Sequence, residues 1–152
     1  MNIKKLLFFI IITIFIATVP SIFIDTSSLY EGFVKPDIYP PSYLFPLVWT
    51  ILYIIMAVSI YIIHETKTYR DKKKSYTLYF TQLIVNSLWT IIYFGLNLKL
   101  IGIIWIILLI TLVIFMLVEF LKINKISAYI NIPYFLWLIY ALILSIQIYN
   151  LN

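Results

Sequence analysis

The chain has 152 residues, of which 64% are hydrophobic and only 11% are charged. A particle of this size cannot bury so much apolar surface, so the composition excludes a water-soluble globular domain and makes lipid the solvent for most of the chain. Cysteine is absent, which excludes disulfides, thiolate metal sites and thiol nucleophiles, and the net charge of +5 has to be located along the chain before it is interpreted.

Charged residues divide the chain into five uncharged stretches, each close to the ~20 residues that a helix needs to cross a bilayer. Because the stretches are continuously apolar rather than alternating, they favour helices over the strands of a membrane barrel. No linker or repeat interrupts them, so we expect one all-α integral membrane domain over residues 1–152, a bundle of five transmembrane helices. The expected spans are residues 4–24, 43–64, 76–96, 99–121 and 127–149, with a first loop at 25–42.

The basic residues predict how the bundle is oriented. Of the 11 Lys and Arg residues, nine fall at the N-terminus and in the second and fourth loops, and two, Lys35 and Lys99, fall on the other side. Basic segments stay in the cytoplasm, so we expect a cytoplasmic N-terminus, with the first loop and the C-terminus outside, in a bacterial cell membrane. The positive charge is therefore a topology signal, and we expect no nucleic-acid partner.

Three spans carry polar and aromatic residues at helical spacing, so that each set shares one face of its helix. An amide in hydrocarbon needs a hydrogen-bond partner, so these faces should point inward. Two interpretations are open: helix packing with inter-helix hydrogen bonds, or an aromatic cavity for a large planar ligand. The faces are Phe45, Trp49, Tyr53 and Met56 in the second span, Gln82, Asn86, Trp89 and Tyr93 in the third, and Tyr134, Trp137, Ala141 and Ser145 in the fifth.

Prolines predict the local structure of two further segments, the first loop and the fifth span. Four of them, Pro36, Pro40, Pro41 and Pro46, cluster at the entry to the second span and predict an ordered first loop over the outer mouth of the bundle. This loop is either a lid or a simple helix start with Pro46 in the first turn. Pro133 predicts a kink in the fifth span near residue 129.

The usual catalytic groups are absent from the sequence. His64 is the only histidine, no glycine-rich phosphate loop exists, and no carboxylate lies deep in any span. We therefore predict no metal site and no resident cofactor, and we disfavour a proton-coupled exporter, which needs an embedded carboxylate. Trp105 and Tyr149 are expected to serve packing or the membrane interface.

Motifs spread over three spans carry a family resemblance. They are Lys35-Pro36, Pro40-Pro41, Phe45, Trp49, Leu52-Tyr53 and Met56, then Gln82-Leu83, Asn86, Trp89 and Phe94-Gly95, and finally Pro133-Tyr134, Trp137, Ala141 and Leu151-Asn152. In these motifs and in its length the chain resembles the TspO/MBR family, the tryptophan-rich sensory proteins, also called translocator protein or peripheral benzodiazepine receptor.

The resemblance implies a five-helix bundle, often a homodimer, that binds porphyrins such as protoporphyrin IX or haem, and benzodiazepine-type ligands, below the first loop. It also implies a sensory, regulatory or transport role in tetrapyrrole handling. Trp49 and Trp137 match family tryptophans implicated in porphyrin interaction and light-dependent porphyrin breakdown, and Asn86, Trp89 and Ala141 match pocket-lining positions. Two positions depart from the family, because Ile38 replaces a tryptophan and Ser145 an asparagine.

We therefore expect porphyrin-type or similar hydrophobic aromatic ligands in an intrabundle pocket below a lid. One alternative is light-dependent oxidative degradation of protoporphyrin IX, with Trp49 and Trp137 as catalytic residues, so enzyme activity stays open. The other is a structural or regulatory membrane partner, in which the polar and aromatic helix faces only pack against neighbouring helices. The expected ligand-binding residues are Phe45, Trp49, Tyr53, Gln82, Asn86, Trp89, Tyr134, Trp137, Ala141 and Ser145, and the expected lid residues are Lys35, Pro36, Ile38, Pro40 and Pro41.

Overall fold

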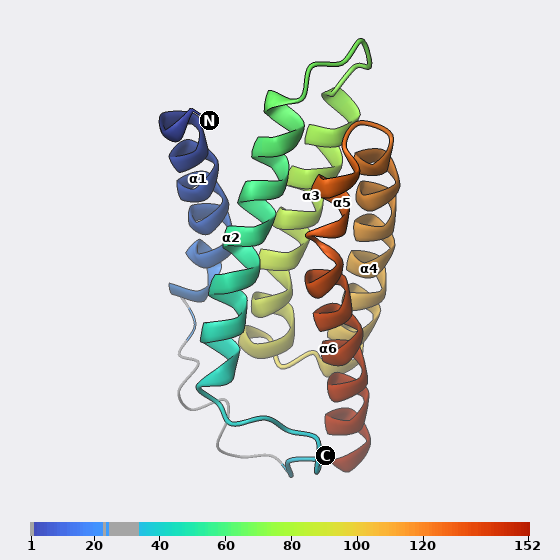
Figure 1. Cartoon of the computed structure of the whole chain (residues 1–152). Coiled ribbons are helices and arrows are strands. Elements are labelled where there is room, and N and C mark those ends of the chain that lie inside the picture. The colour runs from blue at the N-terminus through green and yellow to red at the C-terminus, as the bar shows by residue number, and fades with distance from the viewer. Residues whose placement is uncertain (1, 23, 25–33) are drawn as a thin grey trace.

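A computed structural model describes residues 2–22, 24 and 34–152. In these residues the chain is helical, and its long helices run side by side along one axis (Figure 1). Five of the described helical segments are long and apolar enough to cross a membrane, which confirms the predicted all-α five-span architecture. The elements are α1 (Ile3–Ile22), α2 (Leu44–Glu65), α3 (Lys73–Thr90), η2 (Ile91–Gly95), α4 (Lys99–Leu121), α5 (Lys125–Tyr129) and α6 (Ile132–Leu151).

The predicted spans agree with these helices to within a few residues at each end. Helix α3 continues directly into η2, and together they form the third span. Helices α5 and α6 together form the fifth. Residues 25–33 of the expected first loop lie outside the described residues.

The last span is interrupted where Pro133 predicts a kink. The Asn124 side chain begins α5 by accepting hydrogen bonds from the backbone N–H groups of Ile126 and Ser127. The helix then ends at Tyr129, and α6 begins with Pro133 in its first turn. The N–H that proline lacks would have no partner within the helix at this position, so no helical hydrogen bond is lost. The kink is therefore confirmed, and it separates a short α5 from the long α6.

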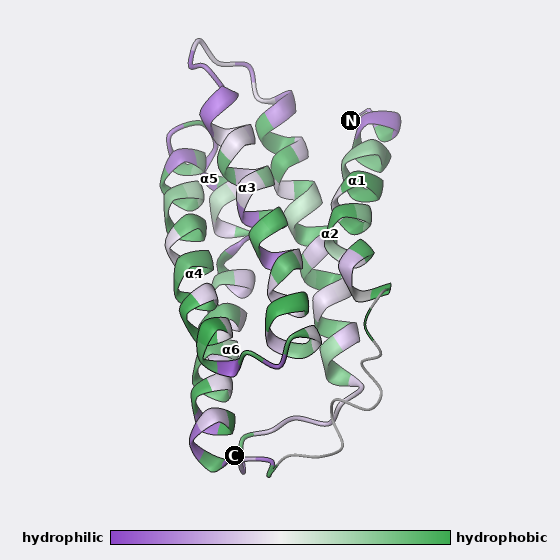
Figure 2. Cartoon of the chain, turned by 180° about the vertical axis from the view of Figure 1, so that it is seen from behind, coloured by the Kyte–Doolittle hydropathy of each residue, from purple (hydrophilic) through white to green (hydrophobic). Residues whose placement is uncertain are grey.

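The most extensive helix contacts are those of α3 with α4, α1 with α2, α4 with α6, and α1 with α3. The core holds large apolar side chains, including Met56, Ile60, Leu83 and Met116, each fully buried. Figure 2 shows hydrophobic residues along the middle of the helices and hydrophilic residues concentrated at their ends. Many large apolar side chains, including Ile11, Ile107 and Leu136, are also exposed on the outside of the bundle. Outward Ile, Leu and Phe side chains are expected when lipid rather than water surrounds the bundle.

The connection between the third and fourth spans is tight. In η2 the helix widens to π geometry, and the N–H of Leu96 donates to the carbonyl oxygen of Ile91 at 2.8 Å. Asn97 follows with a φ of 53°, the left-handed conformation that Asn tolerates better than most residues. The chain thereby reverses direction within three residues, 96–98, and places the start of α4 against the end of α3.

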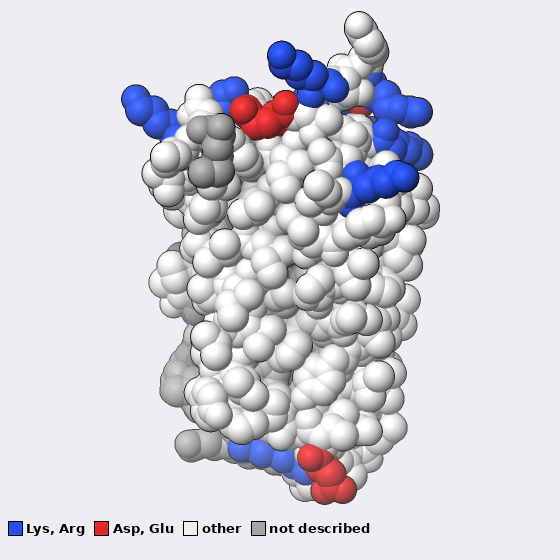
Figure 3. Space-filling view, in the orientation of Figure 1, with Lys and Arg blue, Asp and Glu red and all other residues white. Residues whose placement is uncertain are grey.

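The two ends of the bundle differ, and we name them by their content. The basic end holds the N-terminus and the α2–α3 and α4–α5 connections, and the loop end holds residues 34–43, the connection at 96–98 and the C-terminus (Figure 1). Lys and Arg side chains gather at the basic end in Figure 3. The structure thus places together the three segments that the charge count assigns to one side of the membrane.

Candidate functional site

The aromatic stripe of α2 meets α6 in the half of the bundle near the loop end. The rings of Trp49 and Tyr53 are stacked, with centroids 5.4 Å apart and an interplanar angle of 26°. Trp49 also forms a T-shaped pair with Tyr134, with centroids 6.4 Å apart, and Phe45 forms one with Trp137 at 6.2 Å. These are the favoured geometries of aromatic pairs. We call these five residues the ring cluster.

Helical spacing explains how the ring cluster forms. Phe45, Trp49 and Tyr53 follow one another at intervals of four residues, so their side chains form a row along α2. Tyr134 and Trp137 are three residues apart and share one side of α6. Tyr134 is fully buried, whereas the other four rings are half-buried. The structure thus brings together five of the ten predicted ligand-binding residues.

The first loop packs its own aromatic residue onto this cluster. The Tyr39 ring lies 5.6 Å from that of Phe45, and the Lys35 ammonium lies 5.3 Å from the Tyr39 centroid. The Tyr140 hydroxyl donates a hydrogen bond of 2.8 Å to the carbonyl oxygen of Ile38. The described part of the loop is therefore attached to α6 as well as to α2.

A second attachment joins the loop to the end of the chain. The Asn152 side chain accepts a hydrogen bond of 2.8 Å from the Val34 N–H and donates one of 3.2 Å to the Val34 carbonyl oxygen. The turn that follows is closed by the Tyr39 N–H, which donates to the carbonyl oxygen of Pro36 at 2.9 Å. Among the predicted lid residues Pro36 is buried and Pro40 half-buried, whereas Lys35, Ile38 and Pro41 are exposed. The lid role itself stays a prediction.

A buried polar network lies directly behind the ring cluster. The Tyr134 hydroxyl donates to Gln82 Oε1 at 2.8 Å and accepts from Asn86 Nδ2 at 3.2 Å. Gln82 and Asn86 are 0% and 3% exposed, so both amides point inward as their spacing predicts. Gln82 Nε2 has no hydrogen-bond partner in the described part of the chain. Tyr134 therefore couples the amides of α3 to the Trp49 ring on α2.

Trp89 is placed differently from the other predicted site residues. Its ring stacks on Tyr93 at 4.9 Å, and its Nε1 donates to the carbonyl oxygen of Gly102 at 3.2 Å. The Tyr93 ring in turn fills the space beside Gly102, where an added Cβ would lie 2.5 Å from Tyr93 Cδ2. These contacts fasten the third span to α4, and the predicted ligand-binding role of Trp89 stays a prediction.

Ala141 and Ser145 follow Trp137 on α6 at intervals of four residues. Ala141 is half-buried against the hydrophobic core, and Ser145 is 4% exposed. The small Ala141 and Ser145 side chains thus continue the ring-cluster side of α6 toward the C-terminus.

Trp105, expected to serve packing or the membrane interface, donates from Nε1 to the Val85 carbonyl oxygen at 2.7 Å and so fastens α4 to α3.

Two aromatic residues of the site were not predicted from the sequence. Tyr39 lies between the prolines of the first loop, and Tyr140 follows Trp137 by three residues, on the same side of α6. Tyr140 also contacts the Trp137 ring, with centroids 5.2 Å apart. Helical spacing was a usable signal for Tyr140, whereas only the folded loop shows where the Tyr39 ring points.

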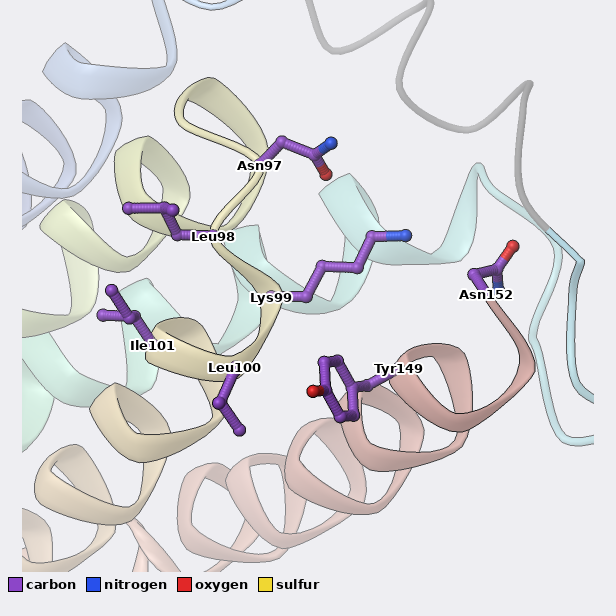
Figure 4. A pocket seen from close by; sticks show the side chains of 7 residues that line it. All are labelled: Asn97, Leu98, Lys99, Leu100, Ile101, Tyr149 and Asn152. Carbon is purple, nitrogen blue, oxygen red and sulfur yellow. The ribbon is translucent and has the colours of Figure 1, made fainter.

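A hollow of about 390 Å³ opens at the loop end between the start of α4 and the end of α6 (Figure 4). The hollow is lined by polar side chains, including Asn97 and Lys99, and by apolar side chains, including Leu98 and Leu100. Tyr149, expected to serve packing or the interface, lines this hollow. The lining residues differ from those of the ring cluster, so this hollow is a separate feature.

No metal centre is present in the described residues, where no group of three or more His, Asp or Glu side chains comes together. His64 lies at the basic end, and its Nδ1 forms a hydrogen bond of 2.7 Å with the Tyr76 hydroxyl. This contact fastens α2 to α3 near the bilayer surface. The described side chains at and behind the ring cluster offer aromatic stacking, apolar burial and neutral amides.

Comparison with protein families matches residues 8–151 to the TspO/MBR family. The chain belongs to this family. TspO/MBR membership covers all five spans, the ring cluster and the described part of the first loop, and it confirms the resemblance seen in the motifs.

Individual TspO/MBR relatives extend the match. The tryptophan-rich protein TspO of Archaeoglobus fulgidus is 37% identical over 100% of this chain and 99% of its own length. Protein CrtK of Rhodobacter capsulatus is 31% identical over 81% of this chain and 78% of its own length. The tryptophan-rich sensory protein of Cereibacter sphaeroides is 26% identical over 81% of this chain and 76% of its length. This chain is thus a multi-pass membrane protein of the TspO/MBR family.

Proposed function

We propose that the chain binds a porphyrin-type ligand at the ring cluster and acts in sensing or transport of tetrapyrroles. The observation that carries the proposal is the stacked Trp49–Tyr53 pair, which packs against Tyr134 of a neighbouring helix. The Phe45–Trp137 pair joins the same two helices, and the attached loop packs on Phe45. Stacked and edge-on rings suit a planar aromatic macrocycle, because its faces can be buried against them. The family resemblance supplies the ligand class.

Polar groups around the ring cluster suit the rest of such a ligand. Lys35 is exposed at the mouth, where its ammonium can pair with a propionate carboxylate. Gln82 and Asn86 lie behind Tyr134 and hold its ring against Trp49. Iron ligation is not part of the proposal, since His64 lies at the opposite end of the bundle.

A titration with protoporphyrin IX in the dark tests this proposal. The purified chain in lipid discs is followed by tryptophan quenching, as the parent and as Trp49→Phe and Trp137→Phe variants. We expect saturable binding that both substitutions weaken by about fivefold or more, because each removes part of a ring contact. Trp105→Phe is the matched control, since Trp105 fastens α4 to α3 outside the ring cluster and should leave the affinity unchanged.

Two results would contradict the proposal. Equal affinity in the parent and in a Trp49→Phe/Trp137→Phe double variant would remove the ring cluster as the site. Loss of stability without any ligand effect in Asn86→Ala and Trp137→Phe variants would favour the structural or regulatory role instead.

We propose light-dependent oxidative degradation of the porphyrin as the second function. Trp49 and Trp137 are oxidisable rings of the ring cluster, so they can pass an electron to a light-excited porphyrin held against them. The reduced porphyrin would pass this electron to dioxygen, and the superoxide would add to the porphyrin and break a carbon–carbon bond of the ring. The adduct would return the electron to the oxidised tryptophan, so that both oxygen atoms end in the product and no other reductant is needed. A product spectrum that forms only with protein and light, and disappears in Trp137→Phe, supports this function, whereas equal bleaching without protein contradicts it.

A further inference from the structure

We propose that Lys74, Glu119 and Lys122 form a site for the phosphate of an anionic phospholipid at the basic end of the bundle. The Glu119 Oε2 atom accepts from Lys122 Nζ at 2.9 Å and lies 3.6 Å from Lys74 Nζ. One carboxylate thus holds two ammonium groups, one from the start of α3 and one from the end of α4. The trio keeps one excess positive charge, which matches the single negative charge of a phosphodiester.

Exposure separates the roles of the three side chains. The Glu119 side chain is 12% exposed, whereas those of Lys74 and Lys122 are 68% and 42% exposed. The carboxylate therefore lies underneath and fixes the spacing of two ammonium groups that face outward. Two donors held at a fixed separation lose little side-chain entropy when they bind a phosphate, and the interaction is charge-assisted.

The charge of the surrounding residues favours binding of an anion at the Lys74–Glu119–Lys122 site. By sequence the basic end carries nine Lys and Arg residues and three acids, Glu65, Asp71 and Glu119. Lys73 precedes Lys74 and Lys125 follows Lys122 by three residues, and both are exposed. Clusters of basic residues at the ends of transmembrane helices attract anionic lipids, by about fivefold in affinity for each residue near the surface.

The position of the site fits a lipid rather than a soluble anion. Lys122 follows the last residue of α4 and Lys74 lies in the first turn of α3, so the ammonium groups are at the level where hydrocarbon meets headgroups. Phe115 and Val118 precede Lys122 by seven and four residues on the same side of α4, and they are 57% and 47% exposed. They offer an apolar surface for the acyl chains of a lipid whose phosphate binds above.

Native mass spectrometry of the full chain in neutral detergent tests the site. The probes are phosphatidylglycerol, phosphatidylcholine and glycerol 3-phosphate, which separate an anionic lipid, a zwitterionic lipid and the headgroup without chains. We expect phosphatidylglycerol to bind about tenfold more tightly than phosphatidylcholine, and the Lys74→Gln/Lys122→Gln variant to lose that preference. Lys74→Arg/Lys122→Arg keeps the charges and should keep it.

A control at the same end distinguishes a built site from a general positive potential. Lys67→Gln/Arg70→Gln removes the same charge from the exposed α2–α3 connection, and neither of these side chains pairs with Glu119, so this variant should lower the preference less than Lys74→Gln/Lys122→Gln does. If the Lys74→Gln/Lys122→Gln variant does not fold, Lys74→Gln alone leaves the Lys122–Glu119 pair intact and should lose part of the preference.

Three results would overturn the proposal. The first is equal binding of the two lipids by the parent, and the second is an equal loss of preference in the Lys67→Gln/Arg70→Gln control. The third is binding of glycerol 3-phosphate as tightly as phosphatidylglycerol, which would assign the site to a soluble phosphate.

Discussion

At Gly102 two aromatic side chains of the third span pack directly against the backbone of α4. Its carbonyl oxygen accepts the Trp89 indole N–H, and the Tyr93 ring occupies the space where a Cβ would stand. The Trp89 and Tyr93 side chains of the third span thus pack against the α4 backbone at a position that has no side chain. Glycine is required here for close packing, since its φ is not positive.

Gly102→Ala should therefore destabilise the protein. The added Cβ would lie 2.5 Å from Tyr93 Cδ2, and the resulting displacement of the ring should cost about 1–3 kcal/mol, more than the helix propensity that alanine adds. Thermal unfolding in detergent, followed by circular dichroism, measures the effect. Gly95→Ala is the control, because its nearest neighbour is the flexible end of the Ile24 side chain at 3.2 Å. Equal stability of the two variants would contradict this account.

Tyr134 has two separable parts, a ring that contacts Trp49 and a hydroxyl that pairs with two buried amides. Tyr134→Phe keeps the ring and leaves the Gln82 oxygen and the Asn86 amide without this partner, which should lower the free energy of unfolding by about 1–3 kcal/mol. The affinity for protoporphyrin IX should fall much less than in Trp49→Phe, as a dark titration can show. A large loss of affinity at unchanged stability would instead make the hydroxyl a ligand contact.

At the scale of the helices, the attachment of the first loop depends on the last residue. Asn152 bonds both backbone groups of Val34, and its Nδ2 also donates to the Ile148 carbonyl oxygen at 2.9 Å. Asn152→Ala removes all three contacts. Because they are exposed or only partly buried, we expect a stability loss below about 1 kcal/mol, but faster release of a bound porphyrin through the loosened loop.

Stopped-flow dissociation in the dark measures the release rate. Thr111→Ala is the matched control, since it removes an exposed hydrogen bond within α4, far from the loop. Unchanged release in Asn152→Ala, although the loop becomes more sensitive to protease, would show that the attachment does not limit exit.

The helices themselves could be predicted from the sequence, whereas their rotations could not. Apolar length and charged gaps suffice to locate spans, because lipid imposes a minimum helix length. A helix face, however, is wide enough to meet two neighbours. The stripe of the third span therefore divides, so that Gln82 and Asn86 meet Tyr134 of α6 while Trp89 meets Gly102 of α4. Spacing alone predicted one inward face for all of them.

The other structural features that the sequence did not predict depend on local backbone geometry and on tertiary contacts. Pro133 signals the break before α6 because proline lacks an N–H, but no residue pattern predicts the π-helical turn of η2 or the positive φ of Asn97. The Lys74–Glu119–Lys122 trio joins residues 45 positions apart, so it exists only once α3 and α4 are paired. Contacts of this kind follow from tertiary packing and not from periodicity.

At the scale of the whole molecule, charge and fold together predict the orientation in the membrane. The N-terminus and the two basic connections share one end, and the described loop residues and the C-terminus share the other (Figures 1 and 3). Nine of the 11 Lys and Arg residues belong to the first end, so we propose that it faces the cytoplasm. The ring cluster would then be reached from the outer side.

Single cysteines test this orientation cleanly, because the chain has none of its own. Thr68 in the α2–α3 connection and Ser42 before α2 are both exposed and lie at opposite ends of the bundle. In intact cells a membrane-impermeant maleimide should label Ser42→Cys at once and Thr68→Cys only after permeabilisation. The reverse pattern would place the basic end outside, against the retention of positive charge in the cytoplasm, and would open the ring cluster to cytoplasmic ligands instead. Equal labelling of both sites in sealed cells would mean that the chain inserts in two orientations.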